Sequence, residues 1–143
     1  MIYPVITIYQ PWATWIIRGW KKIETRTHPR LQSLIHQTIL IHAGQKTDFS
    51  LATISNPYLT DEQIFFNPEE IVNGMILGSA YVDACGWLSG DRWENEEALI
   101  ETTDRFGLFL TDIKKFEEPV PAKGNMGIWY FDMDKKEKVK KPA

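Results

Sequence analysis

The chain has 143 residues, 43% of them hydrophobic and 13% aromatic, which is enough to bury one sizeable core and excludes a disordered polypeptide. No apolar run reaches the roughly 18 residues that a membrane-spanning helix requires, so no membrane association is expected. The formal net charge is −3 although five of the 16 Lys and Arg residues stand within 135–141, so a nucleic-acid site would have to be a local basic pocket.

The overall organisation predicted from the sequence is one domain followed by a tail. No internal repeat or linker-like composition divides residues 1–134, whereas the Lys-rich residues 135–143 have no apolar periodicity and are expected to be disordered. The N-terminus lacks the basic and apolar regions of a secretory signal, and Cys85 has no second cysteine with which to form a disulfide. We therefore expect a cytoplasmic protein.

A short amphipathic helix is predicted between Pro11 and Gly19, because proline suits the first helical position and glycine the C-terminal cap. Helical spacing places Trp12, Trp15 and Ile16 on one apolar face. Three tryptophans stand within residues 12–20, and this density raises the question of whether they belong to the core or to the wall of a binding site.

Strands are predicted where β-branched and aromatic residues cluster: 5–9, 22–26, 38–43, 75–84, 106–110 and 128–131. Gly78 indicates a bulge or a close approach of two backbones within the fourth of these strands. The connection over residues 117–127 contains two prolines, which exclude a central strand there.

The remaining segments are predicted to be helical in short pieces. Thr47 can cap a first piece that Asn56 and Pro57 end, TDEQ from Thr60 forms a capping box for a second, and residues 67–70 open a third turn. Residues 91–102 favour a surface helix. Mostly antiparallel strands with helices in their connections indicate a mainly-β or α+β fold, a small closed β-barrel.

Charged residues are concentrated just after the first helix. In a strand over 22–26 the period of two places Lys22, Glu24 and Arg26 on one face, and Lys21 at the preceding corner can lean toward them. An ionised glutamate between cations can orient the guanidinium fork and the mobile ammonium, a combination suited to phosphate or to a base edge. An ordinary solvated strand edge explains the spacing equally well.

Other kinds of site have little support in the sequence. His42 ends a buried strand, a position typical of a core or rim histidine, and no second His or Cys stands at metal-ligand spacing. The sequence has no phosphate loop, dinucleotide glycine fingerprint or serine nucleophile elbow. We therefore predict neither a metal nor a cofactor.

The run ITIYQPWATWIIRGWKKIETR resembles the signature of the activating-signal-cointegrator homology (ASCH) family, within the PUA-like superfamily. The family pattern has a strand, Gln-Pro-Trp-Ala, a short helix, Gly-x-Lys-x-x-Glu-x-Arg and a later strand ending in His-Ala. ILGSAYVDAC resembles the long glycine-containing strand of the family, and FGLFLTDIKKFEEPVPAKGNMGIW resembles its closing segment. The resemblance extends over most of residues 5–131.

The resemblance implies a PUA-like β-barrel with a cleft beside the first helix, and binding of RNA or a nucleotide. It favours Trp15 and Trp20 as core residues, and leaves Trp12 open between packing and stacking on a base. The candidate ligand contacts that it implies are Gln10, Trp12, Lys21, Glu24, Arg26, His42, Lys123 and Trp129.

Two alternatives remain open. A branch of the family consists of amidohydrolases that act on N4-acetylated cytidine with a lysine, a threonine and a downstream glutamate, and ribonuclease activity has been suggested for the family. Lys21 and Glu24 would then be catalytic, but Glu24 replaces the hydroxyl residue and would keep the pKa of Lys21 high. The downstream acid would fall near Glu94, Glu96 or Glu97. The other alternative is a protein-interaction module, which a large exposed apolar patch away from the cleft would favour.

Overall fold

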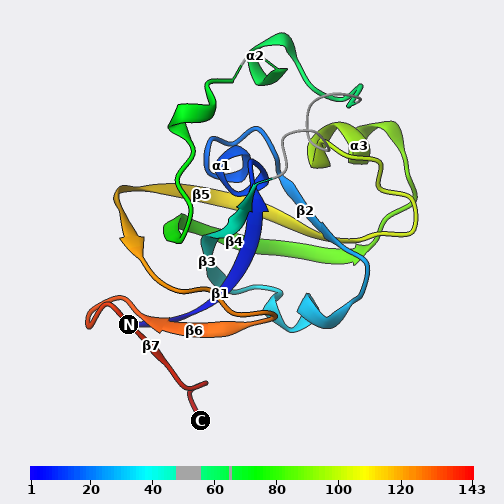
Figure 1. Cartoon of the computed structure of the whole chain (residues 1–143). Helices are drawn as coiled ribbons and strands as arrows, with labels where there is room; N and C mark the ends of the chain where they lie inside the picture. The colour runs from blue at the N-terminus through cyan, green and yellow to red at the C-terminus, as the bar shows by residue number, and fades with distance from the viewer. Residues whose placement is uncertain (48–55, 65) are drawn as a thin grey trace.

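The computed structural model describes residues 1–47, 56–64 and 66–143. Its framework is a seven-stranded sheet (Figure 1) made of β1 (Ile2–Gln10), β2 (Ile23–Arg26), β3 (Thr38–Thr47), β4 (Met75–Trp87), β5 (Phe106–Pro121), β6 (Trp129–Asp132) and β7 (Glu137–Val139). The strand order is β2-β5-β4-β3-β1-β6-β7, with β1 and β3 parallel and the other neighbours antiparallel. The sheet is therefore mixed and mostly antiparallel, as predicted, but the described strands do not close it into a barrel, since β2 and β7 at its two ends are not paired with each other.

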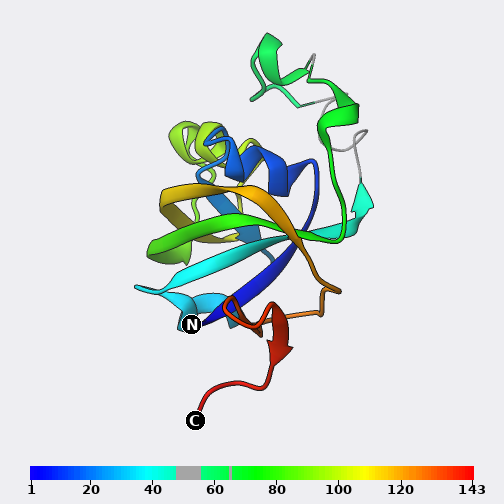
Figure 2. The ribbon, with the colours of Figure 1, turned by 90° about the vertical axis from the view of Figure 1, so that its left-hand side faces the viewer.

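The helices are short and lie in the connections. They are α1 (Trp12–Ile17), α2 (Asp61–Ile64) and α3 (Arg92–Ala98), with 3-10 turns η1 (Arg30–Leu34) and η3 (Pro68–Glu70). Figures 1 and 2 show α1 and α3 on one side of the strands, the segment with α2 beyond α1, and β6, β7 and the N-terminus at the opposite end. None of the described helices is long and apolar enough to cross a membrane.

The predicted ends of the first helix and the predicted capping box of the second are confirmed, whereas the helix expected over 91–102 ends at Ala98, because Leu99 adopts a φ of +57°. Pro11 is the N-cap residue of α1, and Gly19 just beyond the helix has a φ of +79°, which glycine adopts without strain. Thr60 begins α2 with a capping box, since its backbone N–H donates to Gln63 Oε1 at 2.9 Å and its hydroxyl accepts from Gln63 N–H at 3.4 Å. The helical piece that Thr47 was predicted to cap lies outside the described residues.

Gly78 confirms the predicted close approach within β4. The pairing of β4 with β5 shifts register between Ile76 and Gly78. A Cβ at Gly78 would lie 2.2 Å from the Lys114 carbonyl oxygen, so only glycine fits without a shift of the backbone.

β5 is longer than predicted, because it runs through the two prolines to Pro121 instead of ending at residue 110. β2 pairs with β5 only along Phe106–Phe109, and beyond that point β4 is its partner. Pro119 and Pro121 therefore lie where β5 has one neighbour, and a proline needs no second row of backbone hydrogen bonds there. Prolines were expected to exclude a central strand, and the structure agrees with this, because the part of β5 that contains them is an edge strand.

The predicted disorder of the Lys-rich tail is corrected by β7, which pairs with β6 through residues 137–139. Lys138 Nζ donates to Asn125 Oδ1 at 3.0 Å and lies 5.0 Å from the centroid of the Trp129 ring. A short strand held by backbone pairing and by a lysine packed on an aromatic ring needs no regular spacing of apolar residues. The sequence of the tail therefore gave no sign of β7. The domain boundary at residue 134 stays a prediction.

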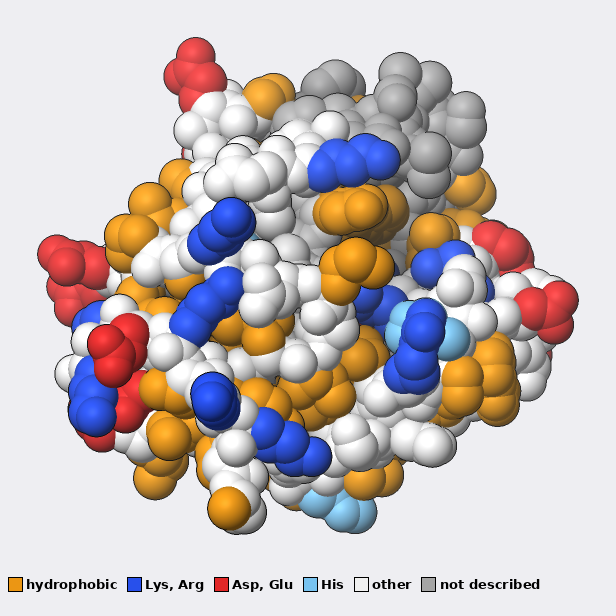
Figure 3. Space-filling model, turned by 60° about the horizontal axis from the view of Figure 1, so that its bottom comes forward, with side chains coloured by type: hydrophobic (Ala, Val, Ile, Leu, Met, Phe, Trp, Pro, Cys, Tyr) orange, Lys and Arg blue, Asp and Glu red, His pale blue; other side chains and the backbone are white. Residues whose placement is uncertain are grey.

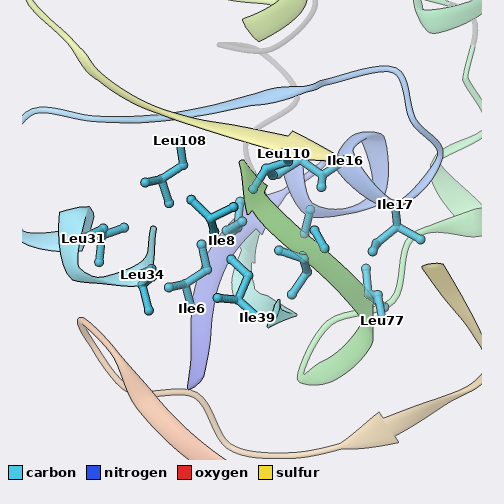
Figure 4. Packing of buried hydrophobic residues seen from close by; sticks show 14 of the residues in the cluster. Ile6, Ile8, Ile16, Ile17, Leu31, Leu34, Ile39, Leu77, Leu108 and Leu110 are labelled. Atoms are coloured by element: carbon cyan, nitrogen blue, oxygen red, sulfur yellow. The ribbon is translucent and has the colours of Figure 1, made fainter. Parts of the chain in front are cut away.

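The main core lies between α1 and the inner strands. Figure 4 shows Ile6 and Ile8 of β1 beside Leu31 and Leu34 of η1, with Ile16 of α1 farther along the same cluster. A second cluster joins fully buried Trp15 to Leu99, with Trp12, Trp20 and Leu59 packed against it. Trp15 is therefore core, as predicted, and Trp20 packs at the edge of the same cluster.

Replacement of Trp15 by alanine should lower the free energy of unfolding by about 3–5 kcal/mol, because the side chain is 0% exposed and its removal leaves a cavity. Urea denaturation of wild type and variant would measure the change. Trp93→Ala is the matched control, since Trp93 is 54% exposed and its loss should cost clearly less than the loss of Trp15. Equal losses for the two variants would contradict the core assignment.

Candidate ligand-binding cleft

A cleft of about 1410 Å³ follows β1, β2 and the start of η1, with residues 121–128 forming one wall. The described residues that line it include one carboxylate, Glu24, and five cationic side chains: Lys21, Arg26, Arg30, Arg105 and Lys123. On one face of the molecule (Figure 3) Lys and Arg side chains stand across the middle, and Asp and Glu side chains lie toward the rims. A chain with a net charge of −3 thus contains a strongly cationic pocket.

The edge strand β2 fixes the first guanidinium. Glu24 and Arg26 share one face, as predicted, and form an ion pair with 3.2 Å between Glu24 Oε2 and Arg26 Nη2. Arg26 Nη2 also donates to the Thr7 carbonyl of β1 at 3.2 Å. Arg26 Nε is buried and has no hydrogen-bond partner among the described residues. The guanidinium is therefore held in place while part of its donor capacity is unused.

Arg105 is a second oriented guanidinium, and the sequence interpretation missed it. Its Nε donates to Thr25 Oγ1 at 2.8 Å, and its Nη2 donates to the Thr25 carbonyl at 3.4 Å. The pairing of Arg26 with Phe106 in the β2–β5 register brings Arg105 beside β2. No motif marks Arg105, so only knowledge of this pairing could have placed it in the cleft.

Lys21 lies at the floor of the cleft and is only 2% exposed. Its ammonium donates to the Ala98 carbonyl at the end of α3 and lies 5.0 Å from the centroid of the Trp12 ring. The pKa of Lys21 is lowered to about 8. Burial is the largest cause, Glu24 acts in the opposite direction, and Arg105 and Arg26 also lower the pKa. Glu24 does raise the pKa of Lys21, as expected, but burial has the larger effect, so the pKa is lowered overall.

Trp12 is half-buried and lines the cleft beside Lys21. Its ring lies 5.2 Å from the Trp15 ring in an edge-to-face arrangement, and the Lys21 ammonium lies over it. These contacts give Trp12 a packing role, and its ring also orients the Lys21 ammonium. Stacking of a base on Trp12 stays a prediction.

Two predicted ligand contacts lie behind the cleft wall. Gln10 is fully buried and does not line the cleft. Its Nε2 donates to Thr14 Oγ1 at 2.7 Å and to the Val72 carbonyl at 2.8 Å. Its Oε1 accepts from the Thr14 N–H at 2.9 Å. Trp129 is also buried, and its Nε1 donates to Thr7 Oγ1 at 3.1 Å. Gln10 thus joins β1 to α1 and to Val72, whereas Trp129 bonds Thr7, a lining residue, from the core side.

The other two predicted contacts reach the cleft. His42 borders it although the residue is only 1% exposed, and both of its ring nitrogens have partners in the protein. Lys123 is exposed on the wall formed by residues 121–128. Of the eight predicted contacts, the structure thus brings six together around one space, and places Gln10 and Trp129 behind it.

The proposed downstream acids have other partners. The Glu94 carboxylate accepts the backbone N–H groups of Ser89 and Asp91, and Glu96 pairs with Arg92 at 2.8 Å. Glu97 Oε2 lies 3.9 Å from Lys22 Nζ, and none of the three glutamates lines the cleft. The described residues contain no cluster of three or more His, Cys, Asp or Glu side chains that could hold a metal ion.

The chain is thus a small domain in which the edge strand, first helix and closing loop of a mixed sheet surround a cationic cleft. The family model of the ASCH domain matches residues 6–123, so the chain belongs to the ASCH domain family, within the PUA-like superfamily. No curated protein showed significant similarity to the chain.

Solved structures share the fold. The ASCH protein from Zymomonas mobilis is 16% identical, the alignment covers 96% of each chain, and the TM-score is 0.57. A serine-to-alanine mutant of the Zymomonas mobilis protein is 19% identical over 83% of this chain and 73% of that chain, with a TM-score of 0.52. At such low identity these likenesses concern the fold alone.

The buried ammonium predicts a specific dependence of stability on pH. Lys21 has a pKa of about 8 in the folded protein against 10.5 for the ordinary side chain, so the unfolded chain binds more protons between these values. The free energy of unfolding should therefore rise with pH across this window by up to roughly 3 kcal/mol relative to Lys21→Met. Denaturant titrations at several pH values would measure the difference, with Lys22→Met as the exposed control. Parallel pH profiles for wild type and Lys21→Met would contradict the assignment.

Proposed function

We propose that the protein binds RNA or a nucleotide in this cleft, and that a phosphate lies among Lys21, Arg26 and Arg105. The charge balance of the cleft carries the proposal. Arg105 and Arg26 each lower the pKa of Lys21, which means that the three cations repel one another, and Glu24 is the one carboxylate among the described lining residues. An anion in this position would relieve that repulsion and accept from guanidiniums that are already oriented.

The size of the cleft favours a ligand larger than one phosphate. Pockets for small molecules typically measure about 300–1,000 Å³, and this cleft measures about 1410 Å³. Arg30 and Lys123 extend the cationic lining beyond the inner three cations. A nucleotide with a flanking phosphate, or a short single-stranded segment, has the charge spacing that such a lining suits.

A hydrolase acting on an N4-acylated nucleoside is the second candidate, and the lowered pKa of Lys21 favours it. Near pH 8 an appreciable fraction of Lys21 is neutral, so its amine can accept a proton from an attacking water. The same cleft would hold the nucleoside, and Glu24 would be the nearby carboxylate because the downstream glutamates lie elsewhere. This candidate rests on the resemblance to the amidohydrolase branch.

The protein-interaction alternative has one observation in its favour. Trp87 and Trp93 are 57% and 54% exposed and do not line the cleft. Each also packs against a phenylalanine of β5, Phe106 and Phe109 respectively, so both side chains have a structural role. The cationic cleft therefore gives more support to a nucleic-acid or nucleotide ligand than these two residues give to a protein partner.

Binding of a fluorescent single-stranded RNA tests the first candidate. Arg26→Ala and Arg105→Ala should each weaken binding by about ten- to a hundredfold, since a hydrogen bond to a charged group contributes about 1.5–3 kcal/mol. Two or three phosphate contacts should give a shallow salt dependence: the logarithm of the association constant should fall with the logarithm of the salt concentration with a slope of roughly −1.4 to −2.1. Lys114→Ala is the matched control, because this exposed lysine lies outside the cleft. Equal loss in the control, or none in either arginine variant, would refute the cleft as the site.

Hydrolysis of N4-acetylcytidine tests the second candidate. If Lys21 is the base, the rate should rise as the pH passes through about 8, because only the deprotonated amine accepts a proton. Lys21→Met should abolish turnover. Binding of RNA without any turnover of the acylated nucleoside by the wild-type protein would leave the first candidate and exclude this one.

A further inference from the structure

Residues 121–128 form the wall of the cleft that carries Lys123, and His42 bonds this wall at Ala122. Nε2 of His42 lies 2.7 Å from the Ala122 carbonyl oxygen, and the Ala122 N–H donates to the Gly74 carbonyl at 3.1 Å. His42 stands on β3 next to a shift in the β3–β4 register, between Ile41 and His42. The imidazole of His42 is therefore one of the groups that hold the start of the wall, together with the backbone of Gly74.

The hydrogen bonds around His42 determine which ring nitrogen carries the proton. A carbonyl oxygen only accepts, so Nε2 must be protonated. The indole N–H of Trp129 only donates, and it donates to Thr7 Oγ1 at 3.1 Å, so the hydroxyl proton of Thr7 is left to bond His42 Nδ1 at 3.1 Å. The hydrogen bonds thus run in one direction from Trp129 through Thr7 and His42 to Ala122. We name these four residues the histidine relay.

The wall is packed closely on this relay. A Cβ at Gly124 would lie 2.7 Å from both His42 Cε1 and Thr7 Oγ1, so the glycine backbone covers the ring directly. Farther along the wall, Asn125 accepts from Lys138 of β7 at 3.0 Å. Lys123 lies between the residue that bonds His42 and the glycine that covers it.

We propose that His42 is a positioning residue, whose neutral form with the proton on Nε2 holds the wall and Lys123 in place, and whose protonation loosens the wall and weakens ligand binding. A protonated ring would donate from Nδ1 to Thr7 Oγ1, which already accepts from Trp129. The Thr7 hydroxyl proton would then lose its acceptor inside a packed region. The part of the proposal that concerns affinity rests on the proposed function.

The surroundings of His42 favour the neutral ring. Burial lowers the pKa of His42, Lys138 lowers it as well, and the hydrogen bond to Ala122 raises it. Lys138 on β7 is the charged side chain that acts on the ring, and Lys123 stands on the wall. Arg26, which reaches the Thr7 carbonyl on β1, is paired with Glu24, and the carboxylates on β6 and β7 are Asp132 and Glu137. Because the folded pKa lies below that of the free side chain, the relay is complete at neutral pH and is lost as the pH falls through the folded pKa.

Glutamine is the discriminating substitution, because its amide can accept from Thr7 and donate to Ala122 but does not titrate. Hydrogen exchange of the amides of residues 123–127 should be measured without ligand at pH 7.5 and pH 5.5, expressed as protection relative to the unfolded chain. Wild-type protection should fall several-fold at pH 5.5, with about tenfold as the limit for one histidine whose ordinary pKa is 6.5. His42→Gln should keep similar protection at both values, and His42→Ala should be poorly protected at both. Thr7→Val, which removes the hydroxyl at nearly constant volume, is the second disrupting variant in case His42→Ala does not fold.

Binding of single-stranded RNA by the same proteins tests the consequence for the ligand. At pH 7.5 His42→Ala should bind at least tenfold more weakly than wild type, and His42→Gln should restore most of the affinity. At pH 5.5 the wild type should lose affinity and His42→Gln should not. An affinity that rises in wild type as the pH falls, or a glutamine variant that follows the wild-type pH profile, would overturn the proposal. If no RNA binds, the proposed function fails, while the exchange measurement still decides whether the relay holds the wall.

Discussion

The antiparallel pairing of β2 with β5 is the constraint on which the cleft depends. It places Arg26 opposite Phe106, and so brings Arg105 to Thr25 although 80 residues separate them along the chain. A slip of one residue would turn Glu24 and Arg26 to the opposite face, because side chains alternate along a strand. One register thus fixes two guanidiniums and the carboxylate that orients one of them.

The cost of this arrangement is electrostatic. Lys21 is buried beside two arginines with Glu24 as the compensating charge, and each arginine makes its charged form less favourable. The Ala98 carbonyl and the Trp12 ring recover part of the lost hydration. Hydrophobic residues of similar size would serve stability better, so an excess of positive charge here is better explained by an anionic ligand than by the needs of the fold.

The elements that sequence reasoning found are those with local causes. The helix between Pro11 and Gly19 and the capping box at Thr60 depend on residues a few positions apart, and both are confirmed. The length of β5 and the presence of β7 depend on distant partners, so their patterns of proline and lysine were misleading. The cleft divides in the same way, because Lys21 and Arg26 are neighbours in the sequence whereas Arg105 joins them through the fold.

Gln10 and His42 show why a polar residue in an apolar strand is an ambiguous signal. Each was a candidate ligand contact, but each uses both of its polar ends within the protein, Gln10 on Thr14 and His42 between Thr7 and Ala122. Most buried polar groups in proteins are hydrogen-bonded, so a fully bonded polar residue of this kind marks a point where two pieces of backbone are held together. The cleft accordingly has an inner layer that fixes its walls and an outer layer of cations, and only the outer layer has donors left for a ligand.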